Sequence, residues 1–600
     1  MARRQATQFR QVNRGAKQSA SFGGIKGQNG NVLPQLLGAD QAITKTNYIQ
    51  DGQGVSESRN GAKKLAEKAG ISGFTDGDWW FGDNFVVAYG TTVAVINKAT
   101  GITTEVKTDF TLDVTAIAVY GNYVFVASGY RGDKLFRIGI ALDYDTQTGN
   151  FATNLILTDS TSGATARIFA DADAGTTGTL TIGDVDNTFG DTNIITDSAT
   201  GSATVDGALY FTATEVSDSV PAKKLFIKTS EGGAKPGSRL VLGQADGNKK
   251  QVVFTGVDEN ALIPWDTSTL WDTAPVTPSP ETAGFIIIAR DVEAITSRGN
   301  SFIIGSKNSR TPFSIGSTTT GATQVIDIQI GWEYKDHGLE AAIDTSHGTF
   351  YLENGGFRKM ISTNKDEQLS DELGSDYFDD ITLENASLVH DTKNNLILAT
   401  YAKNSVSNNE TLAYNTKTKA ITIFKGWNFN VLLKDDSRIY GLSSISGKLY
   451  KVFEGFEDDG KGIPTELTLN VQNTSFIATS VLNRLDFQAV LFEGEELKIH
   501  IDIEEPQGGF IPDYDILTIT GKTPTSQLLS WGSASYGSAG WGGGAGGTSR
   551  LSRKYHTDDL NIEFVSARLR ILSNLKTPHI LNTIIAQLES GNPLNLNNIN

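Results

Sequence analysis

The feature that most constrains this chain is a short unit that recurs along it. The unit consists of an apolar strand, a polar turn with Gly or Asn, and a second strand rich in aromatic and β-branched residues. Residues 84–95 (NFVVAYGTTVAV), 115–126 (TAIAVYGNYVFV) and 388–401 (LVHDTKNNLILATY) show it clearly. Alternation has a period near two, as in half-buried strands. Repetition of one such unit favours a β-propeller, with the number of blades left open because the repeats are degenerate.

The composition agrees with a chain that reverses direction often. Gly is abundant at 63 residues while Pro is scarce at 14, and 600 residues are too many for one core. We therefore predict an all-β fold: a β-propeller with an inserted small β-barrel-like module and a C-terminal β-sandwich or barrel domain. The predicted boundaries are 1–30 for a basic arm, 31–140 for the first part of the propeller, 141–290 for the insert, 291–460 for the second part of the propeller, and 461–600 for the C-terminal domain with a Gly-rich loop at 531–549.

The sequence contains no recognisable motif for catalysis or metal binding. The chain has no Cys, and its six His are scattered without zinc spacing. No phosphate-binding Gly-rich loop and no nucleophile elbow is present. A calcium loop starting at Asp184 would need Gly at 189 and Glu at 195, where Phe and Ile stand. We expect neither catalytic residues nor a cofactor or metal.

An acidic run surrounds Tyr377-Phe378. Paired carboxylates could serve glycoside hydrolysis, but a solvated acidic loop, or one that faces a channel, is the favoured interpretation. The run consists of Asp371, Glu372, Asp376, Asp379 and Asp380.

Two further segments are candidates for contacts with partners. The Gly-rich loop carries Trp531, Tyr536 and Trp541, and exposed aromatic residues of this kind contact a sugar, a membrane or a neighbouring subunit, or else cap their own domain. The N-terminal arm is basic and has no acidic residue, so it either orders on a partner or is a frayed terminus. Its first cations are Arg3, Arg4, Arg10, Arg14 and Lys17.

The remainder of the chain is acidic, with a formal net charge of −17. This charge favours solubility, and it would also allow DNA to slide past without tight phosphate contacts. No signal peptide and no apolar stretch of membrane-spanning length is present. Together with the absence of Cys, this predicts folding in a reducing cytosol.

The order of features resembles the tail hub or nozzle proteins of short-tailed bacteriophages, also called tail tubular protein B. Four stretches carry the likeness: residues 47–61, residues 298–317 with 326–327 and 351–355, residues 412–424 with 439–455, and residues 483–494 with 567–591. The likeness spans most of the chain except the insert.

The resemblance implies a structural virion protein without catalytic activity. Such proteins form a ring, commonly a homohexamer, below an adaptor ring at the portal vertex. They continue the DNA channel and retain the packaged genome. At ejection they conduct double-stranded DNA without sequence-specific binding, and they also carry tail fibres or spikes. The protein would assemble in the host cytoplasm and reside in the virion tail, with the basic arm as the candidate for docking to the ring above.

Other functions remain open at this stage. A receptor-binding tail adhesin would use the loop aromatics on a host surface glycan. A propeller enzyme, such as a glycosidase or lyase, would need an acid/base cluster at the propeller mouth. A binding propeller of unspecified ligand is the third alternative.

Overall fold

The computed structural model describes most of the chain. The described residues are 18–21, 27–28, 41–50, 56–216, 218–229, 238–256, 283–298, 301–320, 323–330, 334–335, 339–362, 365–435, 438–471, 478–491, 494–504, 510–521, 553–557, 560–577 and 579–593. Strands dominate them, with two short 3-10 helices, η4 (Asp371–Leu373) and η5 (Ser375–Phe378). The predicted all-β class is confirmed. No helix in these ranges has the length and apolarity needed to cross a membrane.

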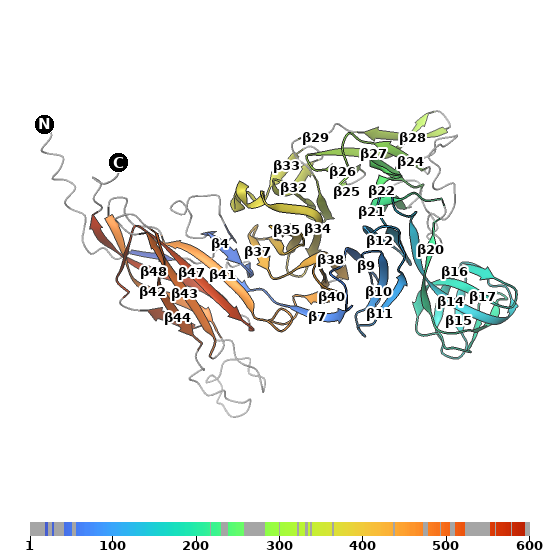
Figure 1. The fold of residues 1–600 in the computed structure, drawn as a ribbon, viewed down its shortest axis with the longest axis horizontal. Coiled ribbons are helices and arrows are strands. Elements are labelled where there is room, and N and C mark those ends of the chain that lie inside the picture. The colour runs from blue at the N-terminus through green and yellow to red at the C-terminus, as the bar shows by residue number, and fades with distance from the viewer. Residues whose placement is uncertain are drawn as a thin grey trace, which may run out of the picture.

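Seven small sheets of the described residues lie around a common centre (Figure 1). Each sheet contacts the next through its first strand, and the strand of the last sheet contacts that of the first again. This arrangement is compatible with a β-propeller, and we call it the propeller-like ring. The first strands, in ring order, are β8 (Asp76–Phe81), β12 (Ala116–Tyr120), β21 (Ala222–Thr229), β25 (Ala294–Arg298), β30 (Ala341–Thr345), β34 (Ile381–Asp391) and β38 (Phe429–Asp435).

The other strands of the ring follow these in antiparallel order. Tight reversals between them use Gly at positive φ, for example Gly90 and Gly121, both near +55° as their turns require. The remaining strands are β9 (Asn84–Tyr89), β10 (Thr92–Asn97), β11 (Thr103–Lys107), β13 (Tyr123–Ala127), β14 (Phe136–Gly149), β20 (Tyr210–Glu215), β22 (Ser238–Ala245), β23 (Asn248–Phe254), β24 (Gly284–Ile287), β26 (Ser301–Ser306), β27 (Ser309–Thr320), β28 (Thr323–Ile330), β29 (Tyr334–Lys335), β31 (Gly348–Glu353), β32 (Gly356–Ser362), β33 (Lys365–Gln368), β35 (Leu396–Lys403), β36 (Glu410–Asn415), β37 (Ile421–Lys425), β39 (Arg438–Ser443) and β40 (Lys448–Val452).

The seventh sheet joins segments from both ends of the chain. Its order is β38-β39-β40-β7, where β7 (Ala62–Glu67) comes from the N-terminal part and pairs antiparallel with β40. Apolar residues of the first and seventh sheets, including Phe85 and Tyr440, pack into one buried cluster. The seventh sheet is therefore complete only when β7 is in place.

The inserted module is a small closed barrel, confined to a shorter range than the predicted 141–290. Strand β14 pairs with β13 and β20 in the ring, and its later residues pair with β17 and β19. The circuit β14-β17-β16-β15-β18-β19 returns to β14, so the barrel lies within residues 140–205. Its other strands are β15 (Ile156–Asp159), β16 (Thr165–Asp173), β17 (Gly178–Asp186), β18 (Ile194–Thr196) and β19 (Ser202–Val205).

Strands β21, β22, β23 and β24, which lie in the range predicted to belong to the insert, form the third sheet of the ring instead. The prediction was wrong here because the small-residue texture that marks the insert ends near Gly207, whereas the apolar strands that follow resemble the other ring strands. The Pro-rich stretch 272–282, with Pro275, Pro278 and Pro280, lies outside the described residues.

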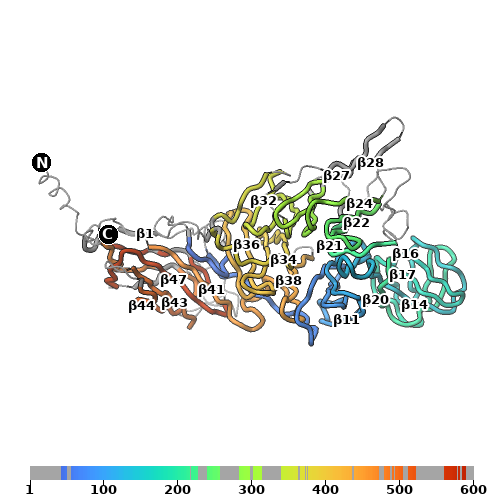
Figure 2. The backbone as a smooth tube through the Cα atoms, turned by 45° about the horizontal axis from the view of Figure 1, so that its top comes forward, coloured from blue at the N-terminus to red at the C-terminus, as the bar shows by residue number. Residues whose placement is uncertain are grey.

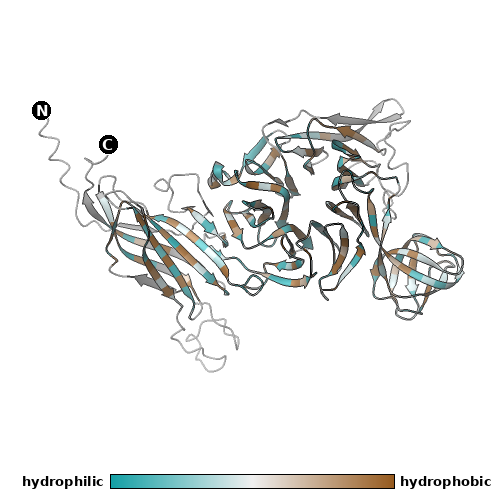
Figure 3. Ribbon diagram, viewed as in Figure 1, coloured by the Kyte–Doolittle hydropathy of each residue, from teal (hydrophilic) through white to brown (hydrophobic). Residues whose placement is uncertain are grey.

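The C-terminal domain is a sandwich of two sheets around one apolar cluster that includes Leu467, Leu485, Ile499 and Leu569. Hydrophobic and hydrophilic residues alternate along its strands (Figure 3), as expected when one face of each sheet is buried. Its strands are β41 (Ile463–Val471), β42 (Ala478–Val490), β43 (Glu496–Glu504), β44 (Phe510–Thr520), β45 (Arg553–Thr557), β46 (Ile562–Phe564), β47 (Ser566–Leu575) and β48 (Ile580–Pro593).

Most of the N-terminal strands belong to this sandwich and not to the ring, which corrects the predicted boundary at 31. Strand β4 (Thr44–Thr46) lies between β41 and ring strand β37, β5 (Tyr48–Gln50) pairs with β6 (Ser56–Ser58), and both β6 and β1 (Gln18–Ser21) pair with β48. Strands β2 (Gly27–Gln28) and β3 (Gln41–Ala42) form a short parallel pair of their own. The sandwich and the barrel lie at opposite ends of an elongated molecule, with the ring between them (Figure 2).

Candidate interaction surfaces

The acidic run forms the connection between β33 and β34, across η4 and η5. Leu373 and Phe378 anchor this connection in a buried cluster of the fifth and sixth sheets. Four of the predicted residues, Asp371, Asp376, Asp379 and Asp380, are exposed, and the side chain of Glu372 lies outside the described residues. Exposure of this kind agrees with a solvated acidic loop.

Tyr377 fixes the loop to the sixth sheet. Its hydroxyl donates to a carboxylate oxygen of Glu410 at 2.6 Å and lies 2.8 Å from the Tyr401 hydroxyl. The Lys403 ammonium lies 3.2 Å from the centre of the Tyr377 ring and donates to the Tyr377 carbonyl at 3.0 Å. Burial raises the pKa of Tyr377 and lowers that of Lys403. The acidic loop is therefore held in one conformation by the contacts of Tyr377 with Glu410, Tyr401 and Lys403 on its inner side.

The remaining predicted site residues lie outside the described residues. They are Arg3, Arg4, Arg10, Arg14 and Lys17 of the basic arm, and Trp531, Tyr536 and Trp541 of the Gly-rich loop. Their roles in docking and in loop contacts stay predictions.

The other acidic motifs have structural roles. The Asp173 carboxylate accepts from the Gly175 amide at 2.6 Å, which forms an Asx turn. Asp133, in the turn between β13 and β14, accepts from the Thr111 amide at 2.8 Å. Within the described ranges no group of three His, Asp or Glu side chains could share a metal ion.

A buried junction, not predicted as a site from the residues themselves, connects the N-terminal segment to the ring. The Arg59 guanidinium, with no exposed side-chain surface, forms a forked ion pair with Asp458. Its Nε donates to Asn47 Oδ1 at 2.9 Å, and its Nη2 donates to the Lys425 carbonyl at 3.0 Å. The Cζ atom of Arg59 lies 4.3 Å from the centre of the Trp427 ring. Burial lowers the pKa of Arg59, opposed by Asp458.

Asp458 and Asn47 complete this junction. Asp458 also accepts from the Trp427 indole at 3.2 Å and the Ala62 amide at 3.1 Å. Asn47 sits at φ +59° and accepts from the Lys425 amide at 2.8 Å. The Asn60-Gly61 pair connects β6 and β7, two strands that do not pair. A Cβ at Gly61 would lie 2.0 Å from the Glu457 carbonyl oxygen, so Gly is needed there for close approach.

His579 forms a second buried junction, between the N-terminal segment and the sandwich. Its Nε2 lies 2.9 Å from the Tyr48 hydroxyl and 3.3 Å from that of Thr465. Its backbone amide donates to the Ser58 hydroxyl at 3.0 Å. Burial lowers the pKa of His579 to about 4, so the ring is neutral at pH 7.

The centre of the propeller-like ring is occupied by charged side chains. Lys223 on β21 lies 3.6 Å from Glu384 on β34, and these two strands are not neighbours in ring order, so the ion pair spans the centre. Asp76 on β8 is buried and accepts from the Ile117 amide at 2.6 Å. Burial raises the pKa of Asp76 to about 7, although the hydrogen bonds from the Gly77 and Ile117 amides act to lower it. The centre is therefore bridged by polar groups.

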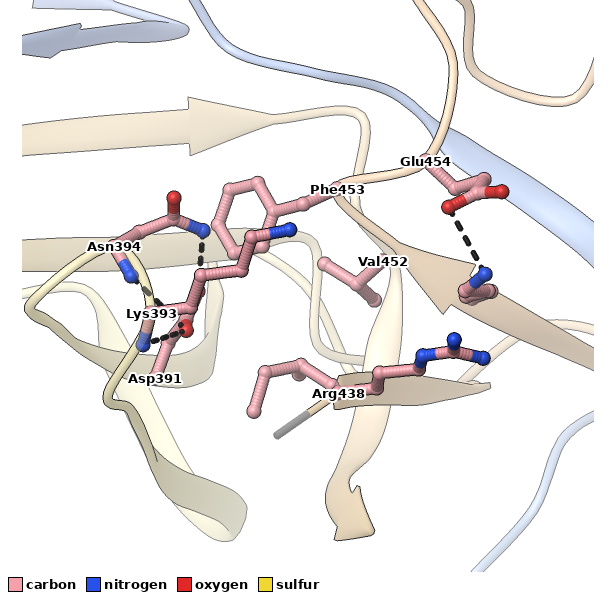
Figure 4. Close-up of a pocket in the computed structure, with 9 residues that line it drawn as sticks. Asp391, Lys393, Asn394, Arg438, Val452, Phe453 and Glu454 are labelled. Atoms are coloured by element: carbon pink, nitrogen blue, oxygen red, sulfur yellow. Dashed lines mark hydrogen bonds and ion pairs between the residues drawn. The ribbon is translucent and has the colours of Figure 1, made fainter. Parts of the chain in front are cut away.

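A pocket of about 320 Å³ lies between the sixth and seventh sheets (Figure 4). The turn after β34 contributes Lys393 to one side, and β39 and β40 contribute Arg438 and Lys451 to the other. Lys451 pairs with Glu454 at 3.0 Å. The Asp391 carboxylate accepts from the amides of Lys393 and Asn394 and from the Asn394 side chain, at 2.6–3.2 Å. Asp391 thus shapes the turn that presents Lys393.

Comparisons with known proteins identify no family. No family model and no curated protein matches the sequence. Among solved structures, the chain is similar to a crystal structure of the computationally designed Ika8 protein, with a TM-score of 0.31 and 11% identity over 65% of this chain and 99% of that chain. It is also similar to a chain in the crystal structure of a mitotic checkpoint complex, with a TM-score of 0.33 and 11% identity over 66% of this chain and 93% of that chain. At such TM-scores the two likenesses bear on neither relationship nor function.

Proposed function

We propose that this protein is a structural ring component of a virion tail, the nozzle or hub that continues the DNA channel below the portal and adaptor. The observation that carries the proposal is the Arg59 junction. It is built on Asn47 and Arg59 of residues 47–61, one of the stretches on which the resemblance to tail hub proteins rests, and it connects this N-terminal segment to Lys425, Trp427 and Asp458 through buried contacts.

Mechanical continuity is what such a role requires. Strand β4 pairs with both the ring and the sandwich, and β7 completes the seventh sheet. Buried ion pairs are costly to break when one partner is removed, so a junction of this kind resists separation of the two parts. A tail component that conducts a pressurised genome benefits from this coupling.

The passage for DNA in this proposal lies between subunits and not along the centre of one propeller-like ring. The Lys223–Glu384 ion pair spans that centre. A formal charge of −17 on each copy disfavours tight phosphate contacts along a shared passage. We expect no catalytic activity, since a channel wall needs shape and charge rather than a reactive group.

Negative-stain microscopy of the purified chain, combined with a mass measurement, tests the proposal. We expect closed rings of about six copies, alone or after addition of an adaptor ring. A trimeric rod would instead favour an adhesin, and a monomer that turns over glycans would favour an enzyme. Either of these two outcomes overturns the proposal.

A further inference from the structure

The sixth sheet of the ring carries opposite charges at its two ends. Strand β34 begins at Ile381, directly after the acidic loop 371–380, and ends at Asp391, directly before the turn that carries Lys393. Strand β34 is bulged between Thr382 and Ser387, so the partner strand β35 gives the span: its 8 residues at about 3.3 Å each separate the two ends by roughly 25 Å. The acidic and basic ends of this sheet therefore cannot meet within one chain.

The basic end consists of two turns in contact. The Thr416 amide donates to the Asn395 carbonyl at 2.8 Å, which brings the turn 416–420 against the turn 392–395. The lysines of the two turns are exposed, and no ion pair among the described residues involves them. They are Lys393, Lys417 and Lys419, which we call the lysine patch.

Nearby acidic groups do not neutralise the lysine patch. Asp391 is buried and bound to the backbone of its own turn. Asp435, on the neighbouring strand β38, is paired with Lys98. Arg438 and the pocket beside it extend the basic surface, and the pocket volume of about 320 Å³ is enough to admit a carboxylate side chain.

The acidic end is equally well formed. Asp371, Asp379 and Asp380 are exposed on a loop whose inner side is held by Tyr377 and by the buried Phe378. The Asp380 carbonyl also accepts from the Asn404 amide at 3.0 Å. A preorganised loop loses little conformational freedom when it docks, which favours specific contact.

We propose that the acidic loop of one copy docks on the lysine patch of a second copy. Because the two surfaces differ, the contact is heterologous and propagates from copy to copy into a ring or a filament. Elsewhere the copies repel, since each carries −17, so local complementarity selects this alignment over others.

The contact deepens the proposed function by naming the surfaces through which the ring would form. Sedimentation velocity of the full chain at 50 and 500 mM NaCl measures it. We expect self-association at low salt that weakens at high salt, because surface charges are screened. Two triple variants are compared with wild type: a basic-reversed variant, K393E/K417E/K419E, and an acid-reversed variant, D371K/D379K/D380K.

Each variant alone should associate about tenfold or more weakly than wild type. Mixing the two should restore association, because the reversed end of each then meets an opposite charge on the other. A control variant changes three exposed lysines outside the patch and should associate like wild type. It is K63E/K250E/K461E. Thermal unfolding checks that all variants fold, which is expected because the altered side chains are exposed.

Three results would overturn the contact. The first is wild-type association in either triple variant, and the second is failure of the mixture to associate. The third is duplex DNA binding that is lost in the basic-reversed variant while self-association is unchanged. If the triple variants still form rings like those of wild type, the contact is overturned but the proposed ring is not. If the wild-type chain stays monomeric with and without an adaptor ring, both the contact and the proposed function are overturned.

Discussion

Replacement of Arg59 by Met should open the connection between the N-terminal segment and the ring. The substitution removes the forked ion pair with Asp458 and leaves that carboxylate with the Trp427 indole and the Ala62 amide as donors. Loss of one partner of a buried pair costs about 3–5 kcal/mol. The Asp458 side chain retains 16% exposure and so keeps some solvent, which places the expected cost near the lower limit, about 3 kcal/mol.

Hydrogen exchange of the β7 amides measures this cost directly. A loss of about 3 kcal/mol corresponds to exchange roughly 100-fold faster, if β7 detaches by local opening. Arg59→Lys should retain little of the exchange protection of β7, since an ammonium cannot form the forked ion pair or stack on Trp427 as a guanidinium does. Arg167→Met is the matched control: its pair with Asp184 is exposed, with side-chain exposures of 38% and 59%, and should change exchange hardly at all.

Removal of the other partner gives an independent check. Asp458→Asn leaves a fully buried guanidinium without its counter-charge, so it should cost at least as much as Arg59→Met. The double variant should cost less than the sum of the two, because neither charge is then left unpaired. The reasoning is refuted if β7 exchange in Arg59→Met stays within threefold of wild type, or if the two single costs simply add.

Three further predictions concern other parts of the chain. His579 has a pKa of about 4 in the folded state, against 6.5 for an ordinary His. Its contribution to the free energy of unfolding is therefore complete above pH 6.5 and falls by about 3 kcal/mol as the pH drops to 4. Urea unfolding of wild type should show this loss of stability between pH 6.5 and 4, and His579→Gln should not show it. Replacement of residues 142–209 by Asn-Gly should leave the ring folded, because β14 and β20 already pair up to Ala141 and Tyr210; unfolding by circular dichroism would show that the barrel is required. Deletion of residues 2–26 should abolish attachment to the adaptor ring, and normal tail assembly would contradict that role for the basic arm.

The local part of the fold could be predicted from the sequence, because alternation and turn residues act over a few positions. The hairpins around Gly90 and Gly121 were found in this way, as was the class of the C-terminal domain. The extent of the insert could not be predicted, since β14 serves the ring and the barrel in one uninterrupted strand. Periodicity reports that a residue is in a strand but not which strand lies beside it.

The candidate surfaces were predictable only where they are contiguous. The acidic loop is one stretch of sequence, so its exposed carboxylates were identified. Arg59 and Asp458 are 399 residues apart, and no local pattern marks an Arg as buried. The lysine patch was missed for the same reason: Lys393 and Lys417 belong to separate turns that meet only after the sixth sheet has formed.

The pairing of β4, β6 and β7 has a consequence for how the protein is made. Their partners β41, β48 and β40 lie some 380–525 residues later in the chain. At about 5–20 residues per second, the ribosome completes those partners tens of seconds or more after the N-terminal strands emerge. During this interval the edges of β4, β6 and β7 are unpaired and could join another nascent chain. The correct ring and sandwich are thus completed late, and spacing between ribosomes on one message should influence the yield of correctly folded protein.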